Sequence, residues 1–163
     1  MDFRLQIQLR VFKVLRFGYI INKVINMLFP KKTKFRKMHR RDSYKKEFRV
    51  NNLIRGEFGI KSLRSGRITA KQLESAKKTM LRKMRRVGRI LLRIFPDVAI
   101  SSKPAEVRMG KGKGSLDYWC SNIHSGRIIF EFQGVSKVVA AEAARLASKK
   151  LPMQTKFVTL EKK

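Results

Sequence analysis

Apolar side chains recur at helical spacing in the middle of the chain. They follow one another every three or four residues from Leu73 onward, as on one face of a helix. Thr69 and Gln72 form a capping-box motif just before this stripe, so a helix is expected to begin at Ala70. Gly88 is expected to end it. The predicted inward face comprises Leu73, Ala76, Met80, Met84 and Val87.

A second helix is predicted over residues 137–150. Ser136 is a suitable N-cap, and Pro152 is a suitable stop because proline cannot continue a helix. The small side chains of this helix suit close packing on a sheet. The side chains expected to face inward are Val139, Ala143 and Leu146.

Short stretches with strand-like patterns alternate with turn residues along the rest of the chain. Strands are expected at 58–63, 67–68, 90–95, 105–109, 116–123, 127–132 and 157–160. A turn at 124–126 would let two hairpins share the strand 116–123. Aromatic residues within these strands are expected to pack in the core or at its rim, and not to stack on bases: Tyr118, Trp119, Phe130 and Phe132. The pattern predicts an α+β fold with an antiparallel or mixed sheet and two packed helices.

The length and composition suit a single folded domain. At 163 residues and 43% hydrophobic, the chain can bury a real core but is short for two domains. The expected organisation is an N-terminal extension (1–28), a basic arm and loop (29–57), the α+β domain (58–160) and a C-terminal tail (161–163).

The charge of the chain indicates a polyanionic partner. Lys and Arg number 40 against 11 Asp and Glu, which gives a formal net charge of +29. A charge of this size repels itself unless a polyanion neutralises it. An anionic membrane surface is the competing polyanion, but the basic residues are spread along the whole chain and not confined to one amphipathic helix. RNA or DNA is therefore favoured.

The sequence contains no pattern typical of a catalytic or metal site. Cys120 is the only cysteine, so no intrachain disulfide can form. With this cysteine and two distant histidines, His39 and His124, no zinc-ligand spacing can be written. The acids form no spaced pair beside a histidine, and no serine or cysteine has an evident base. We expect no metal, no cofactor and no enzymatic activity.

The first 28 residues are apolar and basic. Charges interrupt them too often for a membrane span, which needs about 18 consecutive apolar residues. Their pattern is compatible with a strand or a helix, and both stay open. A mitochondrial transit peptide is rich in Arg and Ser, whereas this segment contains no serine. The segment is therefore expected to be retained in the mature protein.

Basic side chains gather in two further segments. The arm at 31–41 contains no acid, and Phe35 stands among its cations, where an aromatic ring can stack on a base. Residues 42–57 are expected to be loop. The helix at 70–87 has one acid, Glu74, beside a basic face suited to phosphates. The predicted RNA contacts are Lys31, Lys32, Lys34, Phe35, Arg36, Lys37, His39, Arg40 and Arg41 in the arm, and Lys71, Lys78, Arg82, Arg85, Arg86 and Arg89 in or just after the helix.

A basic glycine loop is the most distinctive motif. It consists of Arg108, Met109, Gly110, Lys111, Gly112, Lys113 and Gly114. Alternating glycines permit positive φ and close backbone approach to a large partner, and the cations suit phosphates. The spacing fails as an NTPase phosphate loop, because no Lys-Ser/Thr pair follows the last glycine. A solvated hairpin tip is the alternative, but an anchored loop that touches nucleic acid fits the flanking strands better.

Four motifs in the same order resemble the bacterial-type large-subunit ribosomal protein sixteen family, the universal L-sixteen family. The family signature Arg-Met-Gly-x-Gly-Lys-Gly, then four residues and an aromatic, is matched at 108–114 and Trp119. A basic-x-Gly-basic stretch entering an apolar strand that ends in proline is matched at 86–96, although Leu91 stands where the family usually has Trp or Tyr. The basic opening at 30–39 and the helix start at 68–76 also resemble family sequence.

This resemblance implies a two-helix α+β fold on large-subunit rRNA, beside the site where aminoacyl-tRNA enters the peptidyl transferase centre. The loop at 108–114 would lie nearest tRNA, and Arg108 matches the arginine that some bacteria hydroxylate. The implied partners are large-subunit rRNA, tRNA and neighbouring ribosomal proteins, with no membrane span and no homo-oligomer. The region after His39 lacks the family's usual glycines, so its RNA contacts are expected to differ.

The basic N-terminal extension has no bacterial counterpart in this resemblance, which suggests an organellar ribosome. The mitochondrion is favoured and the plastid is the alternative, since plastid members tend to keep the bacterial length. A free-standing basic RNA-binding protein remains the rival interpretation, because charge alone does not separate it from a ribosomal protein.

Overall fold

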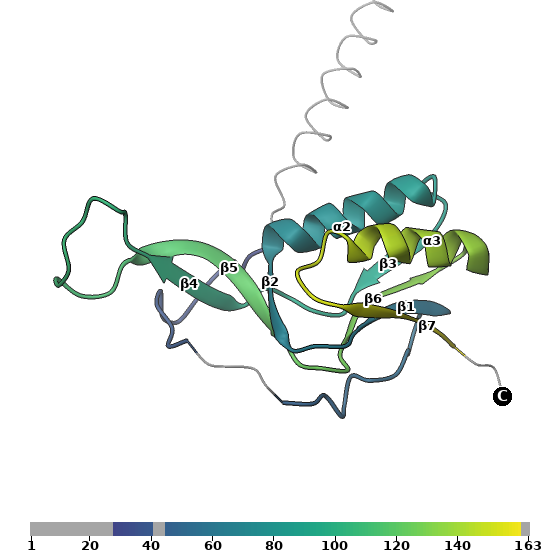
Figure 1. Cartoon of the computed structure of the whole chain (residues 1–163), viewed down its shortest axis with the longest axis horizontal. Coiled ribbons are helices and arrows are strands. Elements are labelled where there is room, and N and C mark those ends of the chain that lie inside the picture. Colours follow the sequence, from purple (N-terminus) through teal and green to yellow (C-terminus); the bar gives the residue numbers. More distant parts are fainter. Residues whose placement is uncertain (1–27, 41–44, 161–163) are drawn as a thin grey trace, which may run out of the picture.

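The computed structural model describes residues 28–40 and 45–160. Predictions for the extension up to residue 27, for Arg41 of the arm and for the tail at 161–163 fall outside these described residues. Within them, the strands form two antiparallel sheets. Two helices accompany the sheets (Figure 1). The predicted α+β class with two helices is confirmed.

A four-stranded sheet forms the centre of the fold. Its order is β3 (Arg89–Leu92), β6 (Ile128–Gln133), β1 (Phe58–Ser62) and β7 (Thr155–Thr159). A three-stranded sheet has the order β2 (Gly66–Thr69), β5 (Ser115–Ile123) and β4 (Val98–Ser102).

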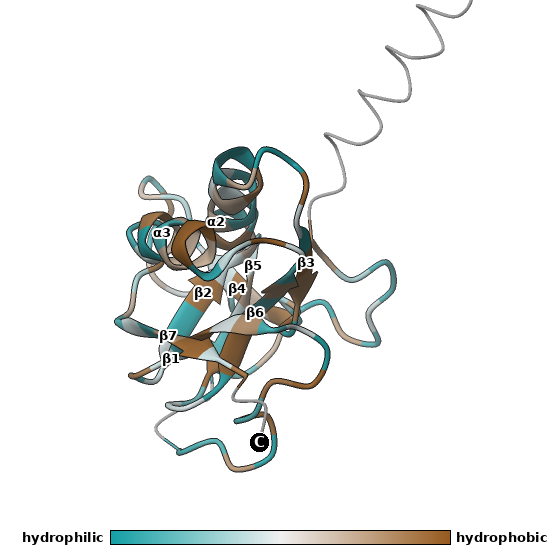
Figure 2. Ribbon diagram, turned by 90° about the vertical axis from the view of Figure 1, so that its right-hand side faces the viewer, coloured by the Kyte–Doolittle hydropathy of each residue, from teal (hydrophilic) through white to brown (hydrophobic). Residues whose placement is uncertain are grey.

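The two helices, α2 (Ala70–Lys83) and α3 (Lys137–Ser148), pack side by side on one face of the four-stranded sheet (Figures 1 and 2). Apolar residues of both helices join Ile60, Phe130 and Phe132 of β1 and β6 in a single buried cluster. The rings of Phe58, Phe132 and Phe157 contact one another in this region. Burying this apolar surface is the main driving force for the fold.

The start of α2 is confirmed in atomic detail. The Gln72 N–H donates to Thr69 Oγ1 at 3.3 Å, and the Thr69 N–H donates to Gln72 Oε1 at 3.0 Å. Leu73, Ala76 and Met80 are fully buried, as their spacing predicts.

The predicted end of α2 is wrong. The helix stops at Lys83 with Met84 as its C-cap, and Arg85 and Arg86 then turn into left-handed backbone with φ of 50° and 65°. This turn carries Val87 off the inward stripe, where it was expected, and leaves it 75% exposed. Gly88 lies beyond the turn and is buried.

Helix α3 matches its predicted range to within two residues at its end, but its inward face is rotated. The buried side chains are Ala140, Ala143, Ala144 and Ala147, whereas Val139 and Leu146 are only half-buried. Alanines let the helix approach α2 and the sheet closely. Ser136 occupies the N-cap position, but its side chain makes no capping hydrogen bond within the described part of the chain.

Two strand predictions are wrong. Residues 105–109 are not a strand, because β4 already ends at Ser102 and the chain then turns, with the Val107 N–H donating to Pro104 O at 3.2 Å. The shared-strand pair of hairpins at 116–132 is also wrong, since β5 and β6 belong to different sheets. After the turn, Gly126 and Arg127 exchange backbone hydrogen bonds of 2.8 Å with Ser62, so the chain joins β1 and does not return along β5.

The segment at 45–57 crosses the four-stranded sheet on the face opposite the helices and is anchored by Glu131. This carboxylate is fully buried in β6. It accepts backbone hydrogen bonds from Arg55 and Gly56, both at 2.9 Å, and from Ile54 at 3.4 Å, and it pairs with Arg93. Burial alone would raise the pKa of Glu131, but these hydrogen bonds and the Arg93 charge outweigh it and hold the pKa below its ordinary value.

Candidate nucleic-acid interface

The β4–β5 hairpin projects from the body and carries the basic glycine loop at its tip (Figure 1). Gly110, Lys111 and Gly112 lie in succession at φ of 96°, 53° and 80°. The positive φ that alternating glycines permit is adopted at Gly110 and Gly112 but not at Gly114, and Lys111 between the first two adopts it as well. Met109 is 100% exposed. The tip therefore presents backbone and side chains to solvent.

The base of this loop is closed by two contacts. A Cβ on Gly114 would lie 2.2 Å from Ser102 O, so the strands approach there as only glycine permits. The Lys103 ammonium also donates to Gly110 O across the loop. The loop therefore has a defined shape.

The arm and the glycine loop lie in contact, although they are far apart in sequence. Lys37 Nζ donates to Lys113 O at 2.6 Å, and Lys113 Nζ donates to Met38 O. The described arm residues from 31 to 40 are all exposed, including every arm residue predicted to bind RNA except Arg41. The two predicted sites thus form one basic surface, which no local sequence signal could have revealed.

The basic face of α2 is a second surface. Its far end lies away from the hairpin tip (Figure 1). Lys78 forms an ion pair with Glu74 at 2.9 Å, so it is partly neutralised. Exposed cations on or just after the helix are Lys71, Lys78, Arg82, Arg85, Arg86 and Arg89.

A concave patch lies on this second surface, at the C-terminal end of α2. Lys78, Arg82, Arg85 and Arg86 line it together with Leu81. The Arg86 N–H donates to Leu81 O at 3.0 Å, which is the long hydrogen bond of a Schellman motif. Arg85 occupies the left-handed position of this motif, where glycine is usual. An arginine in this left-handed conformation destabilises the end of the helix, while its side chain adds a positive charge to the patch.

Arg85→Gly should therefore stabilise the free protein while weakening its binding to RNA. Relief of left-handed strain of about 1–2 kcal/mol exceeds the extra chain entropy of glycine, so we expect a net gain of about 0.5–1 kcal/mol in unfolding free energy. Loss of one phosphate contact should reduce the slope of log affinity against log salt by about 0.7–0.9. Urea unfolding and RNA titrations measure the two effects. Arg89→Gly is the control, since Arg89 lies in β3 and glycine in a strand destabilises. A destabilised Arg85→Gly protein would contradict this account.

Metal ligands, membrane-spanning helices and the single thiol are the other features to consider in the described part of the chain. No cluster of three or more potential metal-binding His, Cys, Asp or Glu residues occurs there. None of the helices in residues 28–40 and 45–160 is long and apolar enough to cross a membrane. Burial raises the pKa of the Cys120 thiol, against the opposing charge of Arg67, so this buried cysteine is held as an unreactive thiol.

Comparison with known proteins shows the family of this chain. The profile of the family described as Ribosomal protein L16p/L10e matches residues 30–158. The chain belongs to this family. The L16p/L10e family is a structural component of ribosomes and not an enzyme, as the sequence motifs and the lack of a catalytic constellation predict.

Curated relatives match this chain over nearly their whole length. The large ribosomal subunit protein uL16 of Paracoccus denitrificans is 50% identical over 135 residues, which cover 83% of this chain and 98% of the relative. Its counterpart in Parvibaculum lavamentivorans is 52% identical over 132 residues, covering 81% and 95%. The one in Acidiphilium cryptum is 50% identical over 133 residues, covering 82% and 96%. This L16-family chain is thus of the bacterial type, and ribosomal RNA and ribosomal proteins are the partners of its class.

Proposed function

We propose that this chain is a constituent of the large ribosomal subunit that binds large-subunit rRNA and helps position tRNA near the A site and the peptidyl transferase centre. The observation that carries the proposal is the projecting β4–β5 hairpin, whose exposed tip holds the family's glycine motif at 108–114. A loop held away from the body of the protein can reach a ligand, such as tRNA, that binds and leaves during translation.

The anchoring contacts in this proposal come from the arm and from α2. Both surfaces are exposed and strongly basic, and the concave patch around Arg82, Arg85 and Arg86 suits a phosphate. The loop contributes fewer cations, and its glycines give reach and close backbone approach. Arm and helix would therefore hold the protein on rRNA, while the loop would contact tRNA.

We place this ribosome in the mitochondrion, with the plastid as the alternative. The family match begins at residue 30, and the preceding residues are basic and apolar. An added segment of this kind on a bacterial-type protein supports an organelle. Fluorescence imaging of the tagged full-length chain beside mitochondrial and plastid markers tests this assignment, and exclusion from mitochondria would overturn it.

Gly112→Val and Lys111→Ala should leave subunits assembled but slow peptide-bond formation. A β-branched residue resists the φ of 80° at position 112, although nothing lies within 4 Å of a Cβ built there. Lys111 is preferred to Lys113 for the charge test, because Lys113 also holds the arm. Loss of one charge-assisted contact should weaken tRNA accommodation by about 1.5–3 kcal/mol.

The measurement is peptide-bond formation on purified mutant ribosomes whose content of this protein has been checked. Lys149→Ala is the matched control, since it removes one exposed cation from the end of α3. Normal rates on fully loaded Gly112→Val and Lys111→Ala ribosomes would reduce the loop to a structural element and remove its tRNA role.

A further inference from the structure

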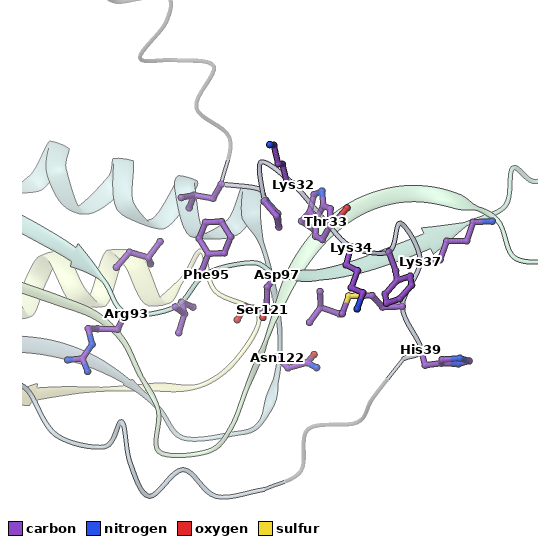
Figure 3. Close-up of a pocket in the computed structure, with 18 of the residues that line it drawn as sticks. Lys32, Thr33, Lys34, Lys37, His39, Arg93, Phe95, Asp97, Ser121 and Asn122 are labelled. Atoms are coloured by element: carbon purple, nitrogen blue, oxygen red, sulfur yellow. The ribbon is translucent and has the colours of Figure 1, made fainter.

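A groove separates the basic arm from the body of the protein (Figure 3). Residues 28–39 form one wall, and the floor comes from the β3–β4 connection at 92–98 and from β5. The arm is tied to the hairpin through Lys37, Met38 and Lys113, at the end of this groove. The arm therefore spans the groove while its side chains stay exposed.

The two sides of the groove differ in charge. Lys32, Lys34 and Lys37 of the arm wall are exposed. On the opposite side, Arg93 is paired with Glu131 and Arg127 with Glu47, the latter at 3.5 Å. Unneutralised positive charge therefore concentrates on the arm, where it can meet phosphates.

The floor presents flat rings and an ordered amide, beside one exposed carboxylate, Asp97. Trp119 is half-buried on β5, and Phe95 is 48% exposed. Arg67 Nε donates to Asn122 Oδ1 at 3.2 Å, which fixes the amide beside Ser121 in the lining. Rings provide stacking surfaces for bases, and amides bond to base edges. Half-burial of Trp119 agrees with the expected packing at the rim of the core and leaves part of its ring facing the groove.

One donor in the lining also lacks an acceptor. Arg127 Nε is buried without a hydrogen-bond partner among the described residues. A buried unpaired donor is unfavourable, and because this nitrogen is closed to solvent, a ligand in the groove would contact the other lining groups instead.

We propose that this groove binds an unpaired nucleotide of RNA, with its phosphates along the arm lysines and its base on the floor formed by Trp119, Phe95 and Asn122. The proposal rests on the proposed rRNA-binding function and names the RNA conformation that this site recognises. An intact duplex keeps its bases stacked inside the helix and cannot offer one to the floor. A single-stranded loop or bulge can.

Trp119 reports on this site directly, because it is the only tryptophan in the chain. Full-length protein is titrated with single-stranded octaadenylate and, separately, with a blunt RNA duplex of equal phosphate content, while fluorescence anisotropy of labelled RNA records binding. We expect the single strand to quench Trp119 emission at saturation. The duplex should bind through the basic surfaces without comparable quenching.

Phe95→Ala tests the stacking floor while Trp119 stays in place as reporter. Losing one stacking ring should weaken octaadenylate binding about 5- to 150-fold and leave duplex binding unchanged. Phe48→Ala is the matched control, since Phe48 is 83% exposed and lies outside the groove lining. Circular dichroism melts confirm that both variants remain folded.

The outcomes separate this proposal from the ribosomal function. If octaadenylate binds without changing Trp119 emission, if the duplex quenches equally, or if folded Phe95→Ala binds as tightly as the parent, the groove is not a nucleotide site, and rRNA binding stands. If neither RNA binds the folded protein, the proposed rRNA-binding function fails together with the groove.

Discussion

Met80→Asp is expected to unfold the domain, whereas replacing Lys78, Arg82 and Arg85 together by Ala should leave it folded and impair its incorporation into subunits. Met80 is fully buried between α2 and the sheet, and an unpaired carboxylate there destabilises by about 3–5 kcal/mol. The basic trio lies on the exposed face of the same helix and contributes little to the core.

Urea unfolding and sedimentation of assembled subunits measure these two effects. Met80→Leu is the control for this position, because exchanging methionine for an apolar side chain of similar volume should change the free energy of unfolding by less than about 1.5 kcal/mol. If the basic triple variant also unfolds, or if Met80→Asp folds normally, the assignment of the two faces of α2 is wrong.

Glu131→Gln should destabilise the protein by about 3–5 kcal/mol at neutral pH, since it leaves Arg93 without its buried partner and weakens three charge-assisted backbone hydrogen bonds. The segment at 45–57 should detach from the sheet first. Glu142→Gln is the matched control, because its pair with Lys83 lies at the surface and should matter by less than about 1 kcal/mol.

The pH dependence of stability provides an independent check on Glu131. Its pKa is lower in the folded than in the unfolded chain, so its ionised form stabilises the fold above the unfolded value of about 4.3. This contribution is lost as the pH falls through the lower folded pKa. The difference in unfolding free energy between the parent and Glu131→Gln should therefore shrink on acidification. A difference that does not change with pH would contradict the lowered pKa assigned to Glu131.

Local signals predicted the helices better than the sheets. The capping box at Thr69 and Gln72 involves neighbouring residues, so the start of α2 could be identified from the sequence. The pairing of β1 with both β6 and β7 depends on contacts between distant strands, and nothing in the turn at 124–126 indicated that β5 and β6 would separate into two sheets. The end of α2 was predicted wrongly from Gly88, because Arg85 and Arg86 adopt the left-handed turn before it.

In the candidate site, too, local features could be predicted from the sequence and long-range contacts could not. The arm, the helix face and the glycine loop were recognisable as runs of residue types, but their arrangement was not. The contacts of Lys113 with Lys37 and Met38 join segments about 75 residues apart, and the groove exists only because the arm folds back over β5. Glu131 could have been suspected, since it is a lone acid inside an apolar strand.

Sedimentation of the tagged full-length chain tests the central claim most directly. A lysate of the organelle that contains the tagged chain is separated on a sucrose gradient under conditions that dissociate the ribosomal subunits, and each fraction is probed for the protein and for both rRNAs. We predict that the protein comigrates with large-subunit rRNA, with no substantial pool in the light fractions. A protein found mainly in the light fractions, or with the small subunit, would contradict its assignment as a constituent of the large ribosomal subunit.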